Sequence, residues 1–365
     1  MNILLVTTHL RMGGVSIYVV TLAQALKRRG HAVTVVSAGG ELVKRLEREG
    51  VTHCYADIDT KSELDPRIFA AAYRLFWLIR EKNVDIVHTN TRVTQVMGEL
   101  LARATGATHL STCHGFFKPR FGRRLFGCWG TKVIAISDAV REHLVNDFRI
   151  RKSRIEMINN GIDLANSRRV YLPHEKKVIR KEMELADGPV VGIIARLSSV
   201  KGHRYLVMAM RKVIDQIPAA QLLIIGEGPE GEELKGMVKD LKLEKSVIFA
   251  KTVLDTRGAL AVMDVFVLPS IHEGLGLALL EALSCAVPVV ASDTGGIYSI
   301  VKDNSTGLLA PPRDSAALAA AILRLLNDRV LAGRLAAAGK DLVYERFSID
   351  DMTTKVEAVY REVRA

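Results

Sequence analysis

Short apolar runs alternate with amphipathic stretches along the first half of the chain. The apolar runs predict strands at Asn2–Thr7, Ala32–Ser37, Val51–Ala56, Val84–Thr89, Thr108–Cys113 and Lys132–Ile136. The amphipathic stretches between them predict helices at Val15–Arg28, Pro66–Glu81, Val93–Thr105 and Asp138–Asn146. Strands that alternate with helices are typical of a parallel sheet covered on both faces, so we expect one Rossmann-like unit here.

A second series of the same kind begins near residue 189. It predicts strands at Pro189–Ala195, Ala220–Ile225, Val247–Ala250, Val265–Leu268, Val287–Ala291 and Gly307–Ala310. Residues 166–188 are polar and charged without clean periodicity, which is typical of a connector. From Asp314 on the pattern is helical, and Ile349–Val363 carries an apolar stripe. The predicted fold class is α/β, with two doubly wound Rossmann-like domains.

The composition agrees with two globular domains. The chain has 365 residues, of which 48% are hydrophobic and 25% charged, as in a soluble protein. No apolar run approaches the roughly 18 residues that span a bilayer, and the first residues predict a strand rather than a signal peptide. The four cysteines are scattered without C-x-x-C spacing, so we expect free thiols in a reducing cytoplasm and no zinc site.

The net charge of +11 is unevenly distributed. Residues 1–165 contain 24 basic and 15 acidic side chains, a balance of +9, whereas the rest of the chain has a balance of only +2. A basic first half predicts a large anionic partner, either a membrane surface or a nucleic acid. A solvated basic face without a partner is the alternative.

One loop between two apolar strands combines glycines with carboxylates. It contains Glu273, Gly274, Leu275 and Gly276 and leads into a predicted helix, Leu277–Ser284, that carries Glu281. Glycines let a backbone approach a ligand closely, and a helix N-terminus offers unpaired N–H groups to an anion. The carboxylates can accept hydrogen bonds from sugar hydroxyls. The alternative is a surface loop that only caps the helix.

The spacing of Glu273 and Glu281 resembles the E-x7-E signature of the family 4 retaining glycosyltransferases. Similar segments occur along nearly the whole chain: Gly13-Gly14, RRGHAVTVV, the CHG of Cys113–Gly115, AISDAV, NNGID, and Arg196 with Lys201-Gly202. The sequence departs from the family at Ala286, where relatives usually have glycine.

The resemblance implies a GT-B architecture, in which two Rossmann-like domains face each other across a cleft. It also implies that the final helix returns to the first domain. We therefore expect an acceptor-side domain of residues 1–165 with about 346–365, and a nucleotide-sugar domain of residues 189–345.

Two cations after a predicted strand are candidates for the reaction itself. Arg196 and Lys201 could neutralise the diphosphate that leaves when the bond to the sugar breaks. The alternative is an exposed basic loop. The resemblance assigns donor-sugar hydroxyls to Glu273, the ribose to Glu281 and a place near the donor sugar to His114, which otherwise is a structural histidine after a strand.

Several glycines are further candidates for donor binding. Gly226 and Gly228 belong to a G-x-G-x-x-G pattern, but it follows the second strand of its series and is rich in glutamate. A redox dinucleotide is therefore not expected there, and the resemblance places this loop beside the nucleotide. The Gly13-Gly14 loop is expected to touch phosphate or acceptor. We expect no metal and no cofactor, because cations and helix amides can stabilise the leaving group of a UDP- or GDP-sugar.

A basic and aromatic segment follows His114 directly. Its members are Phe116, Phe117, Lys118, Arg120, Phe121, Arg123, Arg124 and Trp129. Aromatic rings favour the bilayer interface and basic side chains favour anionic lipid, so the segment predicts membrane contact on the acceptor side. Residues 67–82 have a similar character. In both stretches the alternative is that the aromatic rings pack in the domain core.

Together with the family resemblance, these features predict a retaining glycosyltransferase that moves a sugar from a nucleotide diphosphate sugar to a lipid-linked or cell-envelope glycan, such as a lipopolysaccharide intermediate. It is expected in the cytoplasm, on the inner face of the cytoplasmic membrane. Two alternatives remain: a sugar-nucleotide epimerase on the same fold, and a basic nucleic-acid-binding protein, although no nucleic-acid-binding motif occurs.

Overall fold

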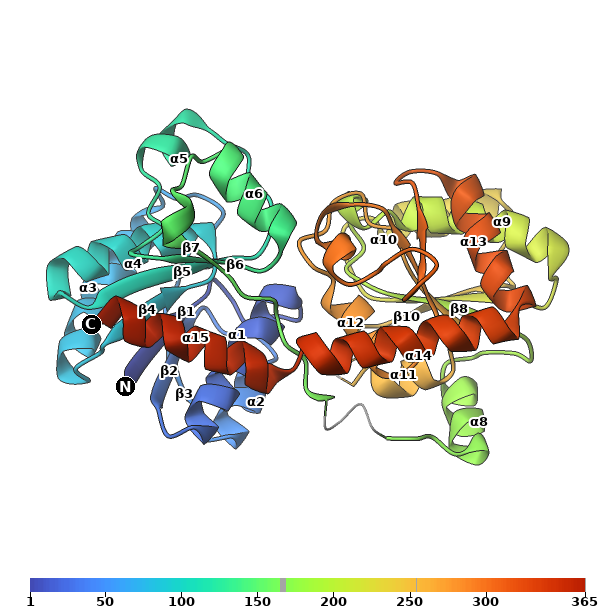
Figure 1. Cartoon of the computed structure of the whole chain (residues 1–365), viewed down its shortest axis with the longest axis horizontal. Coiled ribbons are helices and arrows are strands. Elements are labelled where there is room, and N and C mark those ends of the chain that lie inside the picture. Colours follow the sequence, from blue (N-terminus) through green and yellow to red (C-terminus); the bar gives the residue numbers. More distant parts are fainter. Residues whose placement is uncertain (165–168, 254, 365) are drawn as a thin grey trace. The chain divides into compact units, whose positions relative to one another are not determined.

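The computed structural model describes residues 1–164, 169–253 and 255–364. The chain forms two compact units. The first contains Met1–Gly161 and Ile349–Ala365, and the second contains Ile162–Ser348 (Figure 1). The first unit is therefore built from both ends of the chain.

The first unit is organised around a parallel sheet of seven strands. The strand order is β3-β2-β1-β4-β5-β6-β7, so it reverses direction between β1 and β4. The strands are β1 (Asn2–Val6), β2 (Ala32–Ser37), β3 (Thr52–Tyr55), β4 (Ile86–Thr89), β5 (Thr108–Cys113), β6 (Val133–Ala135) and β7 (Ile155–Met157). In open parallel sheets, ligands bind at the carboxyl ends of the strands beside such a reversal.

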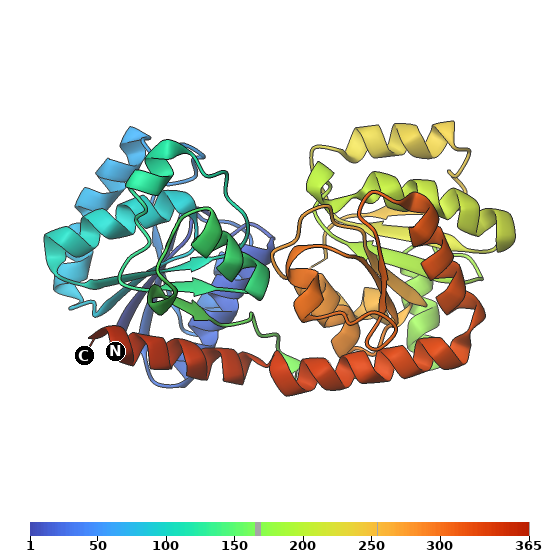
Figure 2. The ribbon, with the colours of Figure 1, turned by 45° about the horizontal axis from the view of Figure 1, so that its top comes forward.

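Helices cover both faces of this sheet (Figure 2). They are α1 (Gly14–Arg28), α2 (Val43–Arg48), α3 (Pro66–Glu81), α4 (Arg92–Thr105), α5 (Phe121–Leu125), α6 (Asp138–Asn146) and α15 (Ile349–Arg364). Successive residues of a strand point to opposite faces. Accordingly, Ile3 and Leu5 of β1 pack in one core with α1 and α15, whereas Leu4 and Val6 pack in another with α3 and α4.

The second unit has a parallel sheet of six strands in the order β10-β9-β8-β11-β12-β13. Its strands are β8 (Val190–Ile194), β9 (Gln221–Ile225), β10 (Val247–Ala250), β11 (Val265–Leu268), β12 (Val289–Ser292) and β13 (Leu308–Ala310). Its helices are α8 (Pro173–Glu182), α9 (His203–Gln216), α10 (Gly231–Asp240), α11 (Arg257–Ala261), α12 (Leu277–Ser284), α13 (Ser315–Asn327) and α14 (Arg329–Arg346). Here the order reverses between β8 and β11.

Local side-chain chemistry sets several helix ends. The Asp65 carboxylate accepts from the Arg67 N–H at the start of α3, and Ser137 does the same for Val140 at the start of α6. The α4 helix stops at Gly106, whose left-handed backbone conformation suits glycine. These caps explain why the predicted bounds of these helices agree with the structure to within a residue.

The predicted fold class is confirmed, because both units are Rossmann-like with all-parallel sheets. The sequence prediction did not include β7 or the helices α2, α5, α10, α11 and α8. The last of these lies inside residues 166–188, the expected connector, of which 166–168 fall outside the described residues. Within the described residues, no helix combines the length and the hydrophobicity that a membrane span requires.

Candidate functional site

Two loops of the second unit meet at the point where its strand order reverses. One follows β8 and carries Arg196 and Lys201, and the other follows β11 and carries Glu273. The Ile271 N–H donates to the Val200 carbonyl over 2.8 Å, which joins the two loops. This edge of the sheet is the expected ligand position in the fold.

Lys201 and Glu273 form an ion pair across these loops. The Lys201 Nζ lies 2.6 Å from Glu273 Oε2, and the Ser270 hydroxyl donates to the same oxygen over 3.1 Å. Only 10% of the Glu273 side chain and 25% of the Lys201 side chain are exposed. The ammonium has three N–H donors, so it can hold this carboxylate and still donate to another oxygen.

Three glycines allow the loops to pack this closely. A Cβ on Gly202 would lie 2.0 Å from the Pro269 carbonyl oxygen, and one on Gly295 would lie 2.3 Å from that of Glu273. A Cβ on Gly296 would lie 1.8 Å from the Gly274 carbonyl oxygen, and the Gly296 N–H donates to Glu273 O. The segment after β12 therefore braces the loop that presents Glu273.

Gly226 and Gly228 support the other loop. Their Cβ atoms would lie 2.1 Å from the Ala195 carbonyl oxygen and 2.2 Å from that of Leu197, on either side of Arg196. The Leu197 N–H donates to the Glu227 carbonyl over 3.1 Å. Packing thus accounts for glycine at both positions, and these residues position the Arg196 loop. Arg196 itself is exposed.

Glu281 lies on α12, the short helix that follows Gly276. Gly276 has a left-handed backbone (φ 99°) at the start of the helix, with Gly274 and Leu275 immediately before it. The Thr256 hydroxyl donates to Glu281 Oε2 over 2.9 Å. Just after the helix, Ala286 also has a positive φ of 55°, a backbone conformation that favours the glycine implied there by the family resemblance.

In the first unit, His114 follows β5 and lies beside residues from two other elements. Its Nε2 is hydrogen-bonded to Asn90 Oδ1 at 3.1 Å, and its ring meets the Tyr18 ring edge-on at 4.6 Å. Burial lowers the pKa of His114 to about 3, so the imidazole is neutral at physiological pH. Neutral histidine has one N–H donor and one acceptor nitrogen, which suits hydrogen bonding to a sugar hydroxyl.

A buried network of polar side chains contacts Tyr18, the residue whose ring packs on His114. The Thr112 hydroxyl is hydrogen-bonded to Tyr18 Oη at 3.3 Å and to His88 Nε2 at 2.7 Å, and His88 Nδ1 is bonded to Tyr360 Oη at 2.7 Å. Burial, with smaller effects from His114 and His109, lowers the pKa of His88 to about 3. The network thus links the C-terminal helix α15 to the ring that packs on His114.

The Gly13-Gly14 loop lies after β1, also beside a reversal of strand order. Gly13 has an extended backbone, and a Cβ on it would meet no atom within 4 Å. In contrast to Gly226 and Gly228, the protein's own packing does not require glycine at this position.

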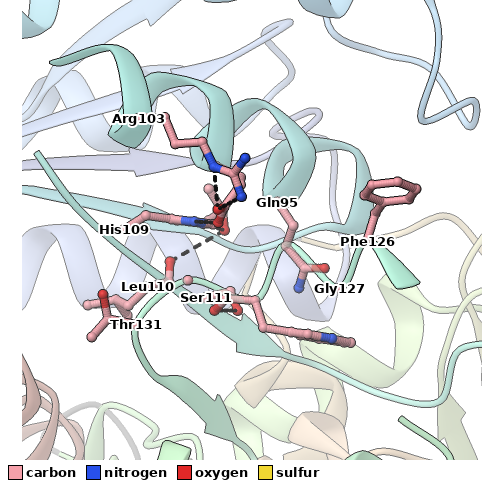
Figure 3. Close-up of polar contacts among 12 residues, drawn as sticks. Gln95, Arg103, His109, Leu110, Ser111, Phe126, Gly127 and Thr131 are labelled. Atoms are coloured by element: carbon pink, nitrogen blue, oxygen red, sulfur yellow. Dashed lines mark hydrogen bonds and ion pairs between the residues drawn. The ribbon is translucent and has the colours of Figure 1, made fainter. Parts of the chain in front are cut away.

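The basic and aromatic segment after His114 divides into buried and exposed parts. Trp129 is only 5% exposed, so its ring belongs to the domain interior. The prediction that Trp129 contacts a membrane is therefore wrong. Phe117 is half-buried against it, and Arg123 is paired with Glu63. In Figure 3, Phe126 points away from the cluster that joins His109 of β5 to α4.

The other members of the segment are accessible. Phe116 is 41% exposed and Phe121 83% exposed, and Lys118, Arg120 and Arg124 are exposed as well. Within residues 1–164, 169–253 and 255–364, no group of three or more His, Cys, Asp or Glu side chains is arranged to hold a metal ion.

Comparison with known proteins identifies the family. Residues 12–166 match the model described as "Glycosyltransferase Family 4", and residues 175–342 match "Glycosyl transferases group 1". The alpha-maltose-1-phosphate synthase of Mycolicibacterium smegmatis is 30% identical over 314 residues, which are 77% of this chain and 79% of that protein. The chain belongs to this glycosyltransferase family.

Other glycosyltransferases are similar over most of the chain. The N-acetyl-alpha-D-glucosaminyl L-malate synthase of Bacillus anthracis is 25% identical, over 98% of this chain and 96% of its own. An Escherichia coli UDP-Gal:alpha-D-GlcNAc-diphosphoundecaprenol alpha-1,3-galactosyltransferase is 28% identical over 78% of this chain and 77% of its own. These relatives transfer sugars, so neither an epimerase nor a nucleic-acid-binding protein is favoured.

Solved structures of glycosyltransferases share the fold. A glycosyltransferase from Rickettsia africae superposes with a TM-score of 0.87 at 25% identity, over 99% of this chain and 98% of that one. Anabaena Alr3699/HepE, solved in complex with UDP-glucose, superposes with a TM-score of 0.88 at 22% identity, over 99% and 100% of the two chains. These neighbours establish the GT-B type of fold for this member of the family.

Sequence reasoning missed the residues that hold the candidate side chains in place. Ser270 bonds Glu273, Thr256 bonds Glu281 and Asn90 bonds His114. Ser270 and Asn90 each come soon after a strand that lies beside the reversal of strand order. Strand order would therefore have pointed to both, but it can be known only once the strands are paired.

Proposed function

We propose that this glycosyltransferase transfers a sugar, with retention of the anomeric configuration, from a nucleotide diphosphate sugar to a lipid-linked or cell-envelope glycan acceptor. The observation that carries the proposal is the Lys201–Glu273 pair at the reversal of strand order, on the same pair of loops as Arg196. The pair brings a phosphate-binding cation and a hydroxyl-binding carboxylate into direct contact.

In the proposed site, Arg196 and Lys201 bind the diphosphate and stabilise the negative charge that grows as it leaves. Glu273 accepts hydrogen bonds from the donor sugar, and Glu281 binds the ribose. The N–H groups around Gly274 to Gly276 add donors at the start of α12. Two cations and these N–H groups neutralise the leaving group, and for this reason we propose that the reaction needs no metal ion.

In this proposal His114 of the first unit binds a sugar hydroxyl. Its low pKa keeps the ring neutral. Because Nε2–H donates to Asn90 Oδ1, Nδ1 can accept a hydrogen bond from a sugar hydroxyl without placing a positive charge beside an oxocarbenium-like transition state. The acceptor attacks from the face that the nucleotide leaves, which retains the configuration. Gly13 and Gly14 offer a backbone that a phosphate or acceptor can approach closely.

The lipid-linked acceptor is supported by charge and by one relative. The first unit carries most of the net positive charge, and the segment after His114 exposes both basic and aromatic side chains. The Escherichia coli relative acts on a diphosphoundecaprenol-linked sugar, as its name states. We therefore place the enzyme in the cytoplasm, at the inner face of the cytoplasmic membrane.

A thermal-shift screen with UDP, GDP, ADP and their sugars tests the donor site. A ligand at a hundred times its Kd stabilises the folded protein by about 2.7 kcal/mol, which raises the melting temperature by several degrees. One nucleotide should give this shift, and Glu281→Ala should remove it. Glu233→Ala, on an exposed side chain of α10, is the matched control and should keep it.

If no nucleotide shifts the melting temperature, or if Glu281→Ala retains the full shift, the assignment of the donor site is wrong. The acceptor is tested separately by following transfer of radiolabelled sugar from the selected donor to prenyl-diphosphate glycans. Conversion of the donor to an epimer without any acceptor would contradict transfer as the reaction.

A further inference from the structure

Exposed aromatic side chains are concentrated in one part of the first unit. Among the described residues, every exposed phenylalanine and tryptophan lies between positions 69 and 126. Core-forming rings of this size are costly to leave in water, and a cluster of them on a soluble protein usually marks an interaction surface.

Three exposed aromatic side chains lie in a row along α3. Ile68, Leu75 and Ile79 on its inner face are buried in the core. Phe69, Tyr73 and Trp77, spaced by four residues, form a stripe on the outer face and are 47%, 70% and 57% exposed. Side chains at this spacing lie on one side of a helix, so the stripe runs along the length of α3.

A charged junction connects the start of α3 to the segment around α5. Glu63 accepts from Arg123 and, over 3.2 Å, from Arg92. Arg92, itself 7% exposed, also donates to the carbonyls of Phe126 and Gly127. The junction holds the two stretches together.

The junction brings further exposed apolar residues to the start of the α3 stripe. Leu64, the residue after Glu63, is 79% exposed, and Phe121 and Phe126 are 83% and 68% exposed. We call the set of six side chains the aromatic patch: Leu64, Phe69, Tyr73, Trp77, Phe121 and Phe126.

On the α5 side of the aromatic patch, the charged side chains of residues 116–126 are all basic. Residues 116–126 contain four basic and no acidic side chains, and three of the four, Lys118, Arg120 and Arg124, are exposed. On α3, Arg74 and Arg80 are also exposed. Glu81 at the end of α3 is exposed too, so the excess of cations lies on the α5 side. Apolar rings beside such cations match a bilayer surface, where the rings enter the interface and the cations meet anionic headgroups.

We propose that the aromatic patch docks this enzyme onto an anionic lipid bilayer, with α3 lying flat in the plane of the interface. The proposal rests on the proposed function, in which the acceptor is lipid-linked, and it names the surface that brings the first unit to that acceptor. It joins the two stretches expected to contact a membrane, residues 67–82 and the segment after His114, into one surface, and it excludes the buried Trp129.

Vesicle flotation of the full chain tests the docking surface. The protein should float with vesicles of phosphatidylglycerol and phosphatidylcholine and remain at the bottom with pure phosphatidylcholine. Trp77→Ser and Phe121→Ser should each weaken binding about tenfold, because affinity follows the apolar area that enters the interface. Tyr298→Ser, on a ring 49% exposed in the second unit, is the control and should float like the wild type.

The contribution of charge is tested with a paired substitution. Lys118→Gln with Arg120→Gln should weaken binding to the anionic vesicles roughly thirtyfold, since each cation near such a surface contributes about fivefold. Lys239→Gln with Lys245→Gln, two exposed lysines of the second unit, removes the same charge and should change binding little.

The proposal would be overturned if the protein did not float with anionic vesicles, or if Trp77→Ser and Phe121→Ser floated like Tyr298→Ser. It would also be overturned if vesicles were not bound and the same two substitutions abolished binding of a single-stranded oligonucleotide. That result would assign the surface to nucleic acid. The variants should keep the nucleotide thermal shift. A wild type that floats but gives no shift with any nucleotide would instead sink the proposed function and leave the docking surface intact.

Discussion

The Lys201–Glu273 pair can be tested by a double-mutant cycle. Lys201→Met removes the cation and leaves a nearly buried carboxylate whose Oε2 still accepts from the Ser270 hydroxyl. Glu273→Gln removes the negative charge and keeps the shape. If the two side chains interact as the structure places them, the double variant should be less destabilised than the sum of the two single variants.

The expected coupling follows from the exposure of the two side chains. Removing one partner of a fully buried pair costs about 3–5 kcal/mol, whereas exposed pairs contribute about 0.2–1 kcal/mol. With 25% of Lys201 and 10% of Glu273 exposed, the pair lies between these limits. We expect Lys201→Met to lower the free energy of unfolding by about 2 kcal/mol and the coupling energy to be about 1.5 kcal/mol.

Urea unfolding of the four full-length proteins measures the cycle, provided that their m-values agree. Arg204 and Glu233 supply a matched control, since they form a 2.9 Å pair whose side chains are 56% and 63% exposed. The same two substitutions there should give a coupling below about 0.5 kcal/mol. If the coupling of Lys201 with Glu273 is no larger than this control, the pair does not form as described, and the donor site built on it is wrong.

Three further predictions concern the backbone and pH. Ala286→Gly should stabilise the protein by about 0.5–1 kcal/mol in urea unfolding, because it relieves a left-handed alanine. Ala320→Gly, on the exposed face of α13, is the control and should destabilise the protein by about 1 kcal/mol. If both substitutions change the free energy of unfolding in the same direction, the backbone argument is refuted. Gly296→Ala should lower the free energy of unfolding by about 3 kcal/mol and abolish the nucleotide thermal shift. Gly236→Ala, whose Cβ meets nothing within 4 Å, is the control and should be neutral or slightly stabilising. If Gly296→Ala changes neither stability nor the shift, the segment after β12 does not brace the Glu273 loop. Two buried histidines have folded-state pKa values of about 3 and 4, below the unfolded value of about 6.5. Between these pKa values the unfolded chain binds more protons than the folded one. The free energy of unfolding should therefore fall as pH drops from 6.5, by up to about 2 kcal/mol per histidine at pH 5. They are His88 and His203. Urea midpoints that do not change between pH 7 and 5 would contradict their burial.

The fold could be predicted from the sequence because its signals are local. Apolar runs such as Val265–Leu268 are bounded by turn residues, and helix starts such as Asp65-Pro66 carry their own caps. The missed β7 is a three-residue edge strand, Ile155–Met157, whose central residue is exposed, so it lacks a continuous apolar run. Edge strands of this kind are defined by pairing rather than by pattern.

The candidate site was predictable only in part. The spacing of Glu273 from Glu281 is visible in the sequence, and so is the departure at Ala286, whose φ of 55° gives it a physical meaning. The Lys201–Glu273 contact joins residues 72 positions apart, and Trp129 is buried beneath a segment that the pattern alone favours as exposed. Such features depend on tertiary packing, which periodicity does not report.

The return of α15 to the first unit has a consequence for synthesis. Met352, Val356 and Tyr360 of this helix complete a core that begins with Ile3, and the Tyr360 hydroxyl completes the chain of contacts that reaches Tyr18. A nascent chain that has left the ribosome only as far as residue 161 therefore lacks one wall of that core. The second unit can finish folding while the first is still open, so a stop codon or truncation before α15 would damage the unit made first.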